Sequence, residues 1–375
     1  MIIWVLAEGL PSKNAPLNGI FEWDQAKALK KIGHKIIYIA IDLRSIRRIR
    51  KLGLQVFERD GIVIFSANFP LGRTIPRVRN WISWMIYKRV CRKILKIYGI
   101  PNIAHAHFAR YTGYAALKAK EKFGIDYIIT EHDSWVNKDL ISDYERKTCK
   151  NVYVEAKQRV AVSRKFQDRL QELYDMHFSY IPNMVDSSFF ECVSKPHNGF
   201  AFISIGSLID GKGMDKTIIG FAEVYKKYPN IKLNIIGTGN QKEELIRLAK
   251  DKGVDDAIVF MGQLPREEIK KYMETADCFV LMSKSETFGV AYIEALAAGL
   301  PVIATKCGGP ESFVNEENGR LIEVDNINEL EQAMEYMLTH KYDSERIKKY
   351  CYENFSAQTV AEKITSLLSS EEEQL

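Results

Sequence analysis

The chain has 375 residues, of which 46% are hydrophobic and 27% charged, with a formal net charge of +5. This length predicts two domains, and the composition excludes a disordered or collagen-like protein. No apolar run approaches the ~20 residues that cross a membrane, the start MIIWVLAEGLP does not predict a secretory signal, and the six Cys form no CxxC pair, which predicts a reducing, cytoplasmic environment.

Charge is distributed unevenly between the two halves of the chain. Residues 1–185 carry 32 Lys and Arg against 17 Asp and Glu, a net charge of +15, whereas residues 186–375 carry 21 against 31, a net charge of −10. Residues 61–120 contain 11 Lys and Arg and no acidic residue. The asymmetry predicts an anionic partner for the first half, and attraction between two oppositely charged domains is the alternative.

Short apolar runs alternate with segments of helical period along the whole chain, which is typical of parallel sheets covered by helices on both faces. In the first half, strands are expected at residues 2–7, 35–41, 62–66, 102–107, 127–130, 159–162 and 179–181, and helices at 21–32 and 81–98. In the second half, strands are expected at 201–205, 232–236, 258–260, 278–281, 301–304 and 320–323, and helices at 344–354 and 357–368.

These elements predict an α/β protein with two doubly wound, Rossmann-like domains facing each other across a cleft. The first domain is expected at residues 1–185 and the second at 186–375, with the linker near Pro182 and Pro196. The two C-terminal helices either cap the second domain or cross back to the first.

A basic stretch in the first half mixes aromatic and aliphatic residues with Lys and Arg over the length of a helix. This composition predicts contact with an anionic membrane surface, through Arg77, Arg79, Trp81, Trp84, Lys88, Arg89, Arg92 and Lys93. A shorter basic run covers residues 44–51. The alternative is an amphipathic helix whose basic face is only solvated, and no recognised nucleic-acid-binding module is present.

Three histidines lie at the ends of two predicted strands. His105 and His107 flank Ala106 and point to the same face, which favours packing over a metal site because a third ligand is missing nearby. His132 lies beside Asp133, where an imidazole could hydrogen-bond a sugar hydroxyl or help to position an acceptor.

Two glycine-rich turns follow neighbouring strands of the second half. Gly206–Gly213 contains Lys212, and Gly237 and Gly239 form the next turn. Glycine turns expose backbone N–H groups, and a helix N-terminus with a lysine suits a diphosphate. A solvated lysine in an ordinary glycine turn is the alternative.

The most informative stretch runs from Ser283 to Ala304, where a loop with Glu286 leads into a helix that begins near Phe288 and Gly289. Amides at that helix N-terminus suit phosphate or developing negative charge. Glu294 lies two helical turns beyond Glu286, among apolar neighbours, and its carboxylate can accept hydrogen bonds from both hydroxyls of a ribose diol.

The span from Gly206 to Gly319 resembles the retaining glycosyltransferases of family 4 with the GT-B fold. Their E-x7-E motif is matched by Glu286 and Glu294, followed by the Ala-Gly-x-Pro-Val-Ile run at residues 298–303. Further matches are Lys212-Gly213, residues 259–262, Gly308-Gly309-Pro310-Glu311 and Asn318-Gly319. In the first half the resemblance continues through residues 18–22, 33–34 and 130–133.

The resemblance implies roles for individual residues, with His132, Glu286 and Lys212 in the catalytic set. Its donor-binding set comprises Gly19, Ser207, Lys212, Gly237, Gly262, Glu286, Phe288, Gly289 and Glu294. Lys212 would hold the diphosphate, Glu286 the donor sugar, Glu294 the ribose and backbone near Gly262 the base. Many members have Arg where this chain has Ser207, so Lys212 alone or another basic residue would have to hold the diphosphate.

The resemblance implies a metal-independent hexosyl transfer, with retention, from a UDP- or GDP-linked sugar. The expected acceptor is a saccharide, in particular a lipid-linked one of capsule, exopolysaccharide or lipopolysaccharide assembly. The expected location is the cytoplasmic face of the membrane, without nucleic acid as a partner. The alternatives are a sugar-nucleotide 2-epimerase of the same fold and a non-catalytic membrane-associated protein.

Overall fold

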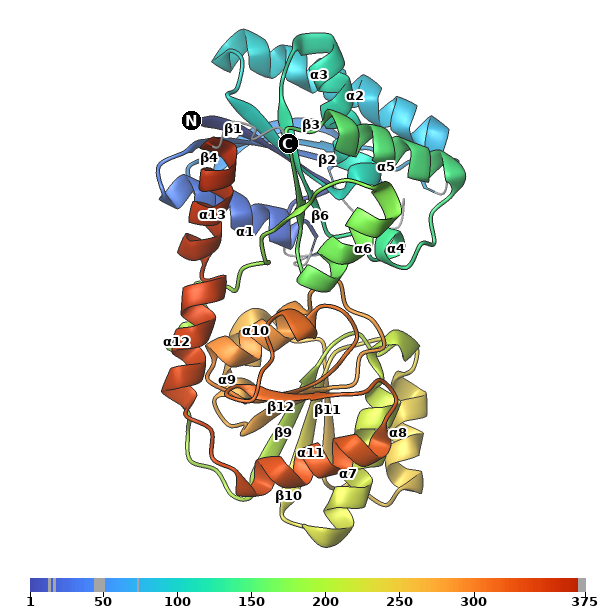
Figure 1. The fold of residues 1–375 in the computed structure, drawn as a ribbon, viewed down its shortest axis with the longest axis vertical. Coiled ribbons are helices and arrows are strands. Elements are labelled where there is room, and N and C mark those ends of the chain that lie inside the picture. The colour runs from blue at the N-terminus through green and yellow to red at the C-terminus, as the bar shows by residue number, and fades with distance from the viewer. Residues whose placement is uncertain (13–14, 16–17, 44–50, 73, 370–375) are drawn as a thin grey trace. The chain divides into compact units, whose positions relative to one another are not determined.

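The computed structural model describes residues 1–12, 15, 18–43, 51–72 and 74–369. The chain forms two compact units, which are drawn in Figure 1. Unit 1 comprises Met1–Val162, Phe166–Met184 and Ala357–Leu375, and unit 2 comprises Ser163–Lys165 and Val185–Ser356. The basic run at residues 44–51 lies outside the described residues except for Lys51.

Unit 1 contains an eight-stranded sheet in the order β3-β4-β2-β1-β5-β6-β7-β8. Its strands are β1 Ile2–Ala7, β2 Lys35–Asp42, β3 Gly53–Arg59, β4 Ile62–Asn68, β5 Ile103–His107, β6 Tyr127–Glu131, β7 Gln158–Ala161 and β8 Ser179–Tyr180. All neighbours are parallel except β3 and β4, which form an antiparallel hairpin. The carboxyl ends of the parallel strands therefore meet at one edge.

Strand β3 was not predicted from the sequence. It is an exposed edge strand, so it lacks the continuous apolar character of the buried strands. Asp60 and Gly61 form the two-residue loop between β3 and β4, with φ values of 51° and 67°. An Asp-Gly pair between two short strands is typical of a β-hairpin turn. This pair is the feature of the sequence from which β3 could have been predicted.

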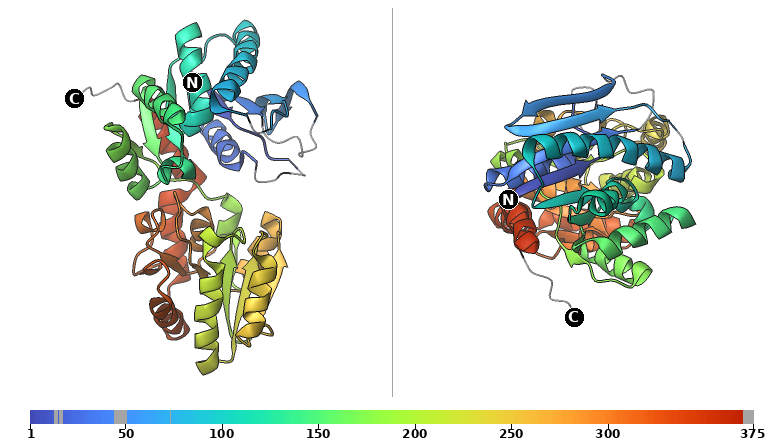
Figure 2. Two further views of the ribbon diagram at one scale, coloured as in Figure 1. Left: turned by 90° about the vertical axis from the view of Figure 1, so that its right-hand side faces the viewer. Right: turned by 90° about the horizontal axis from the view of Figure 1, so that it is seen from above.

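Helices cover both faces of this sheet. They are α1 Ile20–Lys31, α2 Pro76–Tyr98, α3 Tyr114–Phe123, α4 Ser134–Asn137, α5 Asp143–Glu155, α6 Arg164–Tyr174 and α13 Ala357–Ser369. Helices α2, α3 and α5 pack together on one face, and α1 and α13 lie side by side on the other (Figures 1 and 2). Helix α2 begins at Pro76 rather than at residue 81, because proline suits the first position of a helix.

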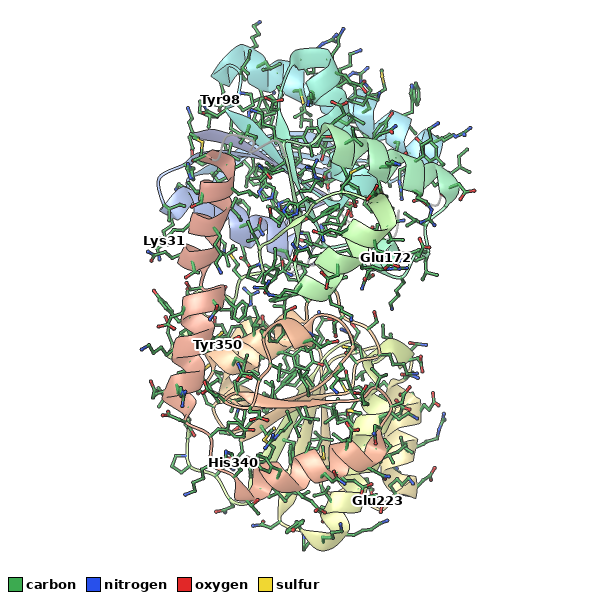
Figure 3. The ribbon with its side chains drawn as sticks, in the orientation of Figure 1. Lys31, Tyr98, Glu172, Glu223, His340 and Tyr350 are labelled. Carbon is green, nitrogen blue, oxygen red and sulfur yellow. The ribbon has the colours of Figure 1, made fainter. Side chains whose placement is uncertain are left out.

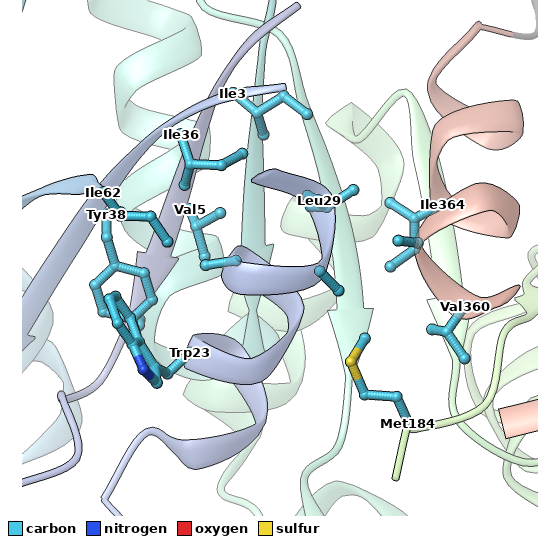
Figure 4. Close-up of a cluster of buried hydrophobic side chains, with 14 of the residues drawn as sticks. Ile3, Val5, Trp23, Leu29, Ile36, Tyr38, Ile62, Met184, Val360 and Ile364 are labelled. Atoms are coloured by element: carbon cyan, nitrogen blue, oxygen red, sulfur yellow. The ribbon is translucent and has the colours of Figure 1, made fainter. Parts of the chain in front are cut away.

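The two C-terminal helices belong to different units. Helix α12 (Ser344–Phe355) lies in unit 2, whereas α13 packs in unit 1. Figure 4 shows Val360 and Ile364 of α13 beside Leu29 of α1 and Met184, in a cluster that also contains Val5 of the sheet. His34 Nε2 lies 2.9 Å from Thr365 Oγ1 of the same helix. Residues 357–369 therefore complete the core of the N-terminal unit.

Unit 2 contains a six-stranded, fully parallel sheet in the order β11-β10-β9-β12-β13-β14. Its strands are β9 Phe200–Ile205, β10 Ile231–Ile236, β11 Ile258–Gly262, β12 Cys278–Leu281, β13 Val302–Thr305 and β14 Gly319–Ile322. The remaining α-helices are α7 Met214–Lys227, α8 Lys242–Asp251, α9 Arg266–Met273, α10 Val290–Ala297 and α11 Ile327–Thr339. Figure 2 shows α7 and α8 side by side on this sheet.

Side chains fill the space between the sheets and their helices, as Figure 3 shows. Tyr98, at the end of α2, packs edge-on against Phe65 at 6.4 Å, and Tyr350 of α12 donates a hydrogen bond to the Phe313 carbonyl at 3.1 Å. Among the described helices, none is long and apolar enough to cross a bilayer.

Candidate functional site

The glycine turns of unit 2 lie together at the carboxyl edge of its sheet, because β10, β9, β12 and β13 are neighbours there. The Gly206 amide donates to the Ile236 carbonyl at 3.0 Å, and the Gly237 amide donates to the Gly262 carbonyl at 2.8 Å. These bonds join the loops after β9, β10 and β11. The sequence-predicted donor residues Ser207, Gly237 and Gly262 are thus in one place, with Ser207 exposed.

Two glycines at this edge cannot be replaced without moving backbone. Gly213 has a φ of +61°, and a Cβ there would lie 2.0 Å from the Met282 carbonyl oxygen. Gly237 has a φ of +149°, and its Cβ would lie 1.8 Å from the Gly206 carbonyl oxygen. Positive φ and close backbone approach both require glycine. The tight packing brings Lys212 to the loop after β12.

Lys212 and Glu286 form an ion pair with an Nζ–Oε1 distance of 2.5 Å. The Ser283 hydroxyl donates to the same Glu286 oxygen at 2.7 Å, and the Glu286 backbone bonds to Cys307 and Gly309. The Lys212 side chain is 27% exposed and that of Glu286 11%, so the pair is partly accessible to solvent. The arrangement offers a positive charge that an anionic ligand can draw away from its carboxylate.

Helix α10 starts beside this pair. Gly289, with a φ of +99°, is its N-cap, and the buried Phe288 ring packs against Phe313 and Phe355 at 5.1 and 6.0 Å. This anchors the positive end of the α10 dipole one turn after Glu286. Glu294 lies further along the helix, with its Oε1 3.9 Å from Nη2 of Arg266.

Sequence reasoning did not find Arg266. It follows a different strand, donates to Asp186 Oδ2 at 2.6 Å and lies against Glu294. The two residues are far apart in the chain, so spacing gave no signal. Arg266 therefore adds a second cation, besides Lys212, to the edge where Glu294 was expected to bind a ribose.

Unit 1 has a different carboxyl edge, in which three histidines are buried. His107 Nδ1 lies 3.0 Å from His132 Nε2, and His105 Nε2 lies 2.8 Å from Thr130 Oγ1. Burial lowers the pKa of His105 to about 3 and that of His107 well below its ordinary value. Burial also lowers the pKa of His132 to about 3, against a hydrogen-bonding contribution of Asn183 that raises it. All three imidazoles are therefore neutral at physiological pH.

Glu131 organises the loops at this edge, and sequence reasoning gave it no role. Its carboxylate accepts hydrogen bonds from the amides of Ala109, His132 and Asp133 at 3.0, 3.0 and 2.9 Å, and from the Tyr153 hydroxyl at 2.6 Å. Burial and the nearby Asp133 raise its pKa, while these hydrogen bonds act in the opposite direction. One buried carboxylate therefore fixes the backbone on both sides of His132.

A second buried network lies beside it. Arg110 donates to Asp133 Oδ2 at 2.6 Å and to Glu145 Oε1 at 3.0 Å. Phe108 precedes it with a φ of +68°, which is rare for an aromatic residue, at the start of a π-helical turn. Its ring lies 5.3 Å from that of His132. Both the backbone outlier and the π-turn are features that cluster at functional sites.

Gly19 lies at the same edge, as the N-cap of α1 with a φ of +70°. A Cβ there would lie 2.3 Å from the Gly9 carbonyl oxygen, so the loop requires glycine for its own structure. Its role toward a donor diphosphate stays a prediction.

The residues expected to face a membrane divide into two groups on α2. Arg77, Trp81, Arg89, Arg92 and Lys93 are exposed, and Lys88 is half-buried. Arg79 stacks on Tyr111 at 4.2 Å near Glu145, and Trp84 packs against Phe123 at 6.3 Å. The five exposed residues are the most accessible to a partner, whereas Lys88, Arg79 and Trp84 are all half-buried.

Among the described residues, no group of three or more His, Cys, Asp or Glu is arranged to hold a metal ion. The three histidines of unit 1 do not form such a group. His105 and His107 pack instead, with ring centroids 4.3 Å apart.

Family models match both halves of the chain. Residues 23–189 match the model "Glycosyltransferase Family 4", and residues 187–354 match "Glycosyl transferases group 1". A Bacillus subtilis protein named "Putative teichuronic acid biosynthesis glycosyltransferase TuaC" is 27% identical over 93% of this chain and 90% of its own length.

Solved structures with the same fold cover nearly the whole chain. Sucrose-phosphate synthase from Thermosynechococcus elongatus has a TM-score of 0.79 at 19% identity, covering 98% of each chain. Anabaena HepE, solved in complex with UDP and glucose, has a TM-score of 0.74 at 16% identity, covering 99% of each chain. With one family model on each half, the chain belongs to the glycosyltransferases of the GT-B fold, with a family 4 domain followed by a group 1 domain.

Proposed function

We propose that this glycosyltransferase moves a hexosyl-type sugar from a UDP- or GDP-linked donor, with retention, to a saccharide acceptor. The acceptor is lipid-linked and belongs to capsule, exopolysaccharide or lipopolysaccharide assembly. The binding of the nucleotide-sugar donor is supported by the Lys212–Glu286 pair, which lies at a glycine-lined edge of the sheet. The enzyme works at the cytoplasmic face of the membrane.

The donor diphosphate binds at the edge where the Gly206–Gly213 and Gly237 turns meet. Lys212 exchanges its ion pair with Glu286 for one with the diphosphate. The backbone amides of Phe288 and Gly289 at the α10 N-terminus also donate to the diphosphate. Glu286 then accepts hydrogen bonds from the donor sugar, Glu294 holds the ribose and backbone near Gly262 meets the base. Ser207 provides no charge, so Lys212 is the principal cation for the diphosphate.

Transfer forms a bond between the acceptor oxygen and the anomeric carbon while the bond from that carbon to the diphosphate oxygen breaks. The electron pair of the broken bond stays on the diphosphate, where Lys212 and the helix N-terminus stabilise it. The proton of the acceptor hydroxyl passes to the leaving phosphate oxygen. The role assigned to His132 is to orient the reacting sugar through hydrogen bonding.

The exposed face of α2 is the proposed membrane contact. Ile75, Val78, Trp81 and Met85 follow helical spacing and are all exposed, with Trp81 at 62%. Arg77, Arg89, Arg92 and Lys93 are also exposed on the same helix. Each basic residue near an anionic surface contributes about 1 kcal/mol of binding, so this helix can hold the enzyme beside a lipid-linked acceptor.

The donor site is tested by thermal-shift measurements with a panel of UDP-, GDP- and ADP-sugars and with the free nucleotides. One nucleotide class should raise the melting temperature of the wild type, because binding stabilises only the folded chain. The Lys212→Ala variant should lose this shift. No shift with any nucleotide would overturn the proposed donor site.

Activity of the Glu286→Ala variant tests the role of the carboxylate. The wild type should release nucleoside diphosphate only slowly without acceptor and faster with lipid-linked saccharide. A donor that is converted to its 2-epimer without any acceptor, or full transfer by Glu286→Ala, would contradict the proposal.

A further inference from the structure

His132 is held in one orientation by the rings around it. The His107 and His132 rings are inclined by only 19°, with centroids 5.3 Å apart, and Phe21 lies nearly parallel to His132 at 6.2 Å. The Phe108 ring packs at 5.3 Å. With the ring plane fixed, the chemistry of His132 depends on which nitrogen carries its proton.

His107 is itself rigid. Its backbone amide donates to Thr112 Oγ1 at 2.9 Å, and the same hydroxyl donates to the His107 carbonyl. The side chain is fully buried, and the His105 ring stacks on it. His107 therefore presents Nδ1 to His132 Nε2 in a fixed geometry, at 3.0 Å.

Between two neutral imidazoles, only one of the two facing nitrogens carries the proton. His107 Nε2 is buried and has no hydrogen-bond partner within the described part of the chain. A proton on that nitrogen would leave an N–H group buried without an acceptor, which is rarer in proteins than an unpaired acceptor. The His107 proton therefore belongs on Nδ1, from which it donates to His132 Nε2.

Asn183 favours the same arrangement at the other nitrogen of His132. His132 Nδ1 and Asn183 Oδ1 are both buried, and neither has a partner of full hydrogen-bond geometry among the described residues. The Asn183 side chain nevertheless acts on His132 as a hydrogen-bonding neighbour. A proton on Nδ1 gives the Asn183 oxygen a donor, whereas a proton on Nε2 leaves both Asn183 Oδ1 and His107 Nε2–H unmatched.

We propose that His107 is a positioning residue that fixes His132 as the Nδ1–H tautomer, so that His132 acts as a hydrogen-bond donor and not as a base. Its Nε2 lone pair is occupied by the His107 N–H, and the single polar hydrogen it offers, to Asn183 or to a sugar hydroxyl, is on Nδ1. The inference rests on the proposed function only for placing His132 beside the reacting sugar. It then requires the acceptor proton to leave by another group, the donor phosphate.

The tautomer can be read directly in the ligand-free wild-type protein. Long-range 15N–1H spectra of 15N-histidine-labelled protein distinguish a protonated from a bare ring nitrogen, and the His132 and His107 signals are assigned by single His→Asn and His→Gln variants. We expect Nδ1–H for both residues. An Nε2–H signal for His132 would overturn the proposal, and either of the two variants at a position suffices to assign its signal, so a variant that does not fold can be replaced by the other.

Two variants of His107 test whether its Nδ1–H group fixes the tautomer of His132. In His107→Asn the amide nitrogen is bonded to Cγ, as Nδ1 is, so it can still donate to His132 Nε2. In His107→Gln the amide nitrogen is one atom further along the chain, where Nε2 lies. We expect His132 to stay Nδ1–H in His107→Asn and to populate Nε2–H in His107→Gln, with at least a tenfold larger loss of transfer rate in the second variant.

Equal His132 spectra and equal rates in the two variants would overturn the role of His107. UDP binding measured by thermal shift serves as the separate check. If the wild type binds no nucleotide, the proposed function fails while the tautomer assignment stands. If UDP or GDP binds and His132 is Nε2–H, the inference fails alone.

Discussion

The two sheets carry different chemistry at their carboxyl edges. In unit 1 the polar side chains of this edge are buried and paired with one another: Arg110 with Asp133 and Glu145, and His107 with His132. In unit 2 the edge consists of glycine backbone around a Lys212–Glu286 pair whose side chains are 27% and 11% exposed. The same doubly wound architecture thus supports a rigid edge of buried, paired side chains in one unit and an edge with a partly exposed cation in the other.

The difference shows how each edge can recognise a ligand. A buried network of paired side chains holds its shape and offers few groups to exchange. A glycine-lined edge lets a phosphate approach backbone, and an ion pair open to solvent can exchange one partner for the ligand. Recognition of the anionic donor therefore suits unit 2, and orientation of neutral hydroxyls suits unit 1.

Lowering the pH should distinguish the two units most strongly, because buried histidines occur, among the described residues, only in unit 1. Burial lowers the folded-state pKa of His105 and His132 to about 3, whereas unfolded histidines titrate near 6.5. The unfolded chain therefore binds protons first. Stability is fully present above ~6.5 and falls as the pH drops toward ~3, by up to about 1.4 kcal/mol per pH unit for each histidine.

Tryptophan fluorescence measures this effect selectively, since all five Trp are in unit 1. We expect its melting temperature to fall by many degrees between pH 7 and pH 5, while the unfolding transition of unit 2, followed by calorimetry, moves much less. The raised pKa of Glu131 opposes part of the loss, because protonation stabilises that buried carboxyl. Equal shifts of both transitions would contradict the assignment.

Lys212→Ala should remove the accessible cation from the unit 2 edge. We expect a loss of about 100-fold in transfer rate, or about 3 kcal/mol, because a charge that meets the departing diphosphate is lost. Lys227→Ala is the matched control, since Lys227 forms a similar 2.7 Å pair with Glu335 at the other end of α7. Steady-state kinetics compare the two variants, and similar rates in both would remove Lys212 from the site.

Glycine substitutions test whether the turn of unit 2 depends on its backbone conformation. Gly213→Ala places a Cβ 2.0 Å from a carbonyl oxygen at positive φ, whereas Gly211→Ala meets nothing within 4 Å. We expect the first to lower the free energy of unfolding of unit 2 by more than about 2 kcal/mol and the second to change it by less than about 0.5 kcal/mol. Chemical denaturation measures both, and a stable Gly213→Ala protein would show that the turn is not rigid.

Trp81→Ala and Trp84→Ala separate the exposed face of α2 from its packed face. Trp81→Ala should weaken binding to anionic vesicles by about 1.5 kcal/mol, roughly tenfold, without changing the melting temperature. Trp84→Ala should lower the melting temperature through lost packing against Phe123 and leave vesicle binding unchanged. Vesicle co-sedimentation tests both, and equal vesicle binding by Trp81→Ala and wild type would contradict a membrane contact through this helix.

Most strands could be predicted because buried parallel strands are continuous apolar runs, which the sequence displays directly. The structure extends or shortens these strands by at most two residues at either end. Strand β3 was not predicted, because a strand at an exposed edge lacks a continuous apolar run. The sequence also does not tell which unit holds the last helix. Packing against α1, through Val360 and Ile364, decides that question.

The unit 2 residues could be predicted because their chemistry follows from local spacing: Lys212 in a glycine turn and Glu286 before a helix. The ion pair of Arg266 and the hydrogen bonds of Glu131 could not be predicted, since their partners lie on other elements: Glu294 on α10, Ala109 in the π-helical turn and Tyr153 on α5. The same limit applies to His107, whose contact with His132 depends on β5 and β6 being neighbours. The contacts of Arg79 with Tyr111 and Glu145 could not be predicted either, because charge alone does not tell which helix face packs inward.

The return of α13 to unit 1 affects the order in which the protein is completed. During synthesis residues 1–184 emerge first, but Val360, Ala361 and Ile364 of the same core emerge only after the whole of unit 2. Domains fold as units once their residues are available. The core of the N-terminal unit is therefore completed last. When a ribosome stalls before residue 357, the apolar side chains of Leu29 and Met184 remain exposed to chaperones.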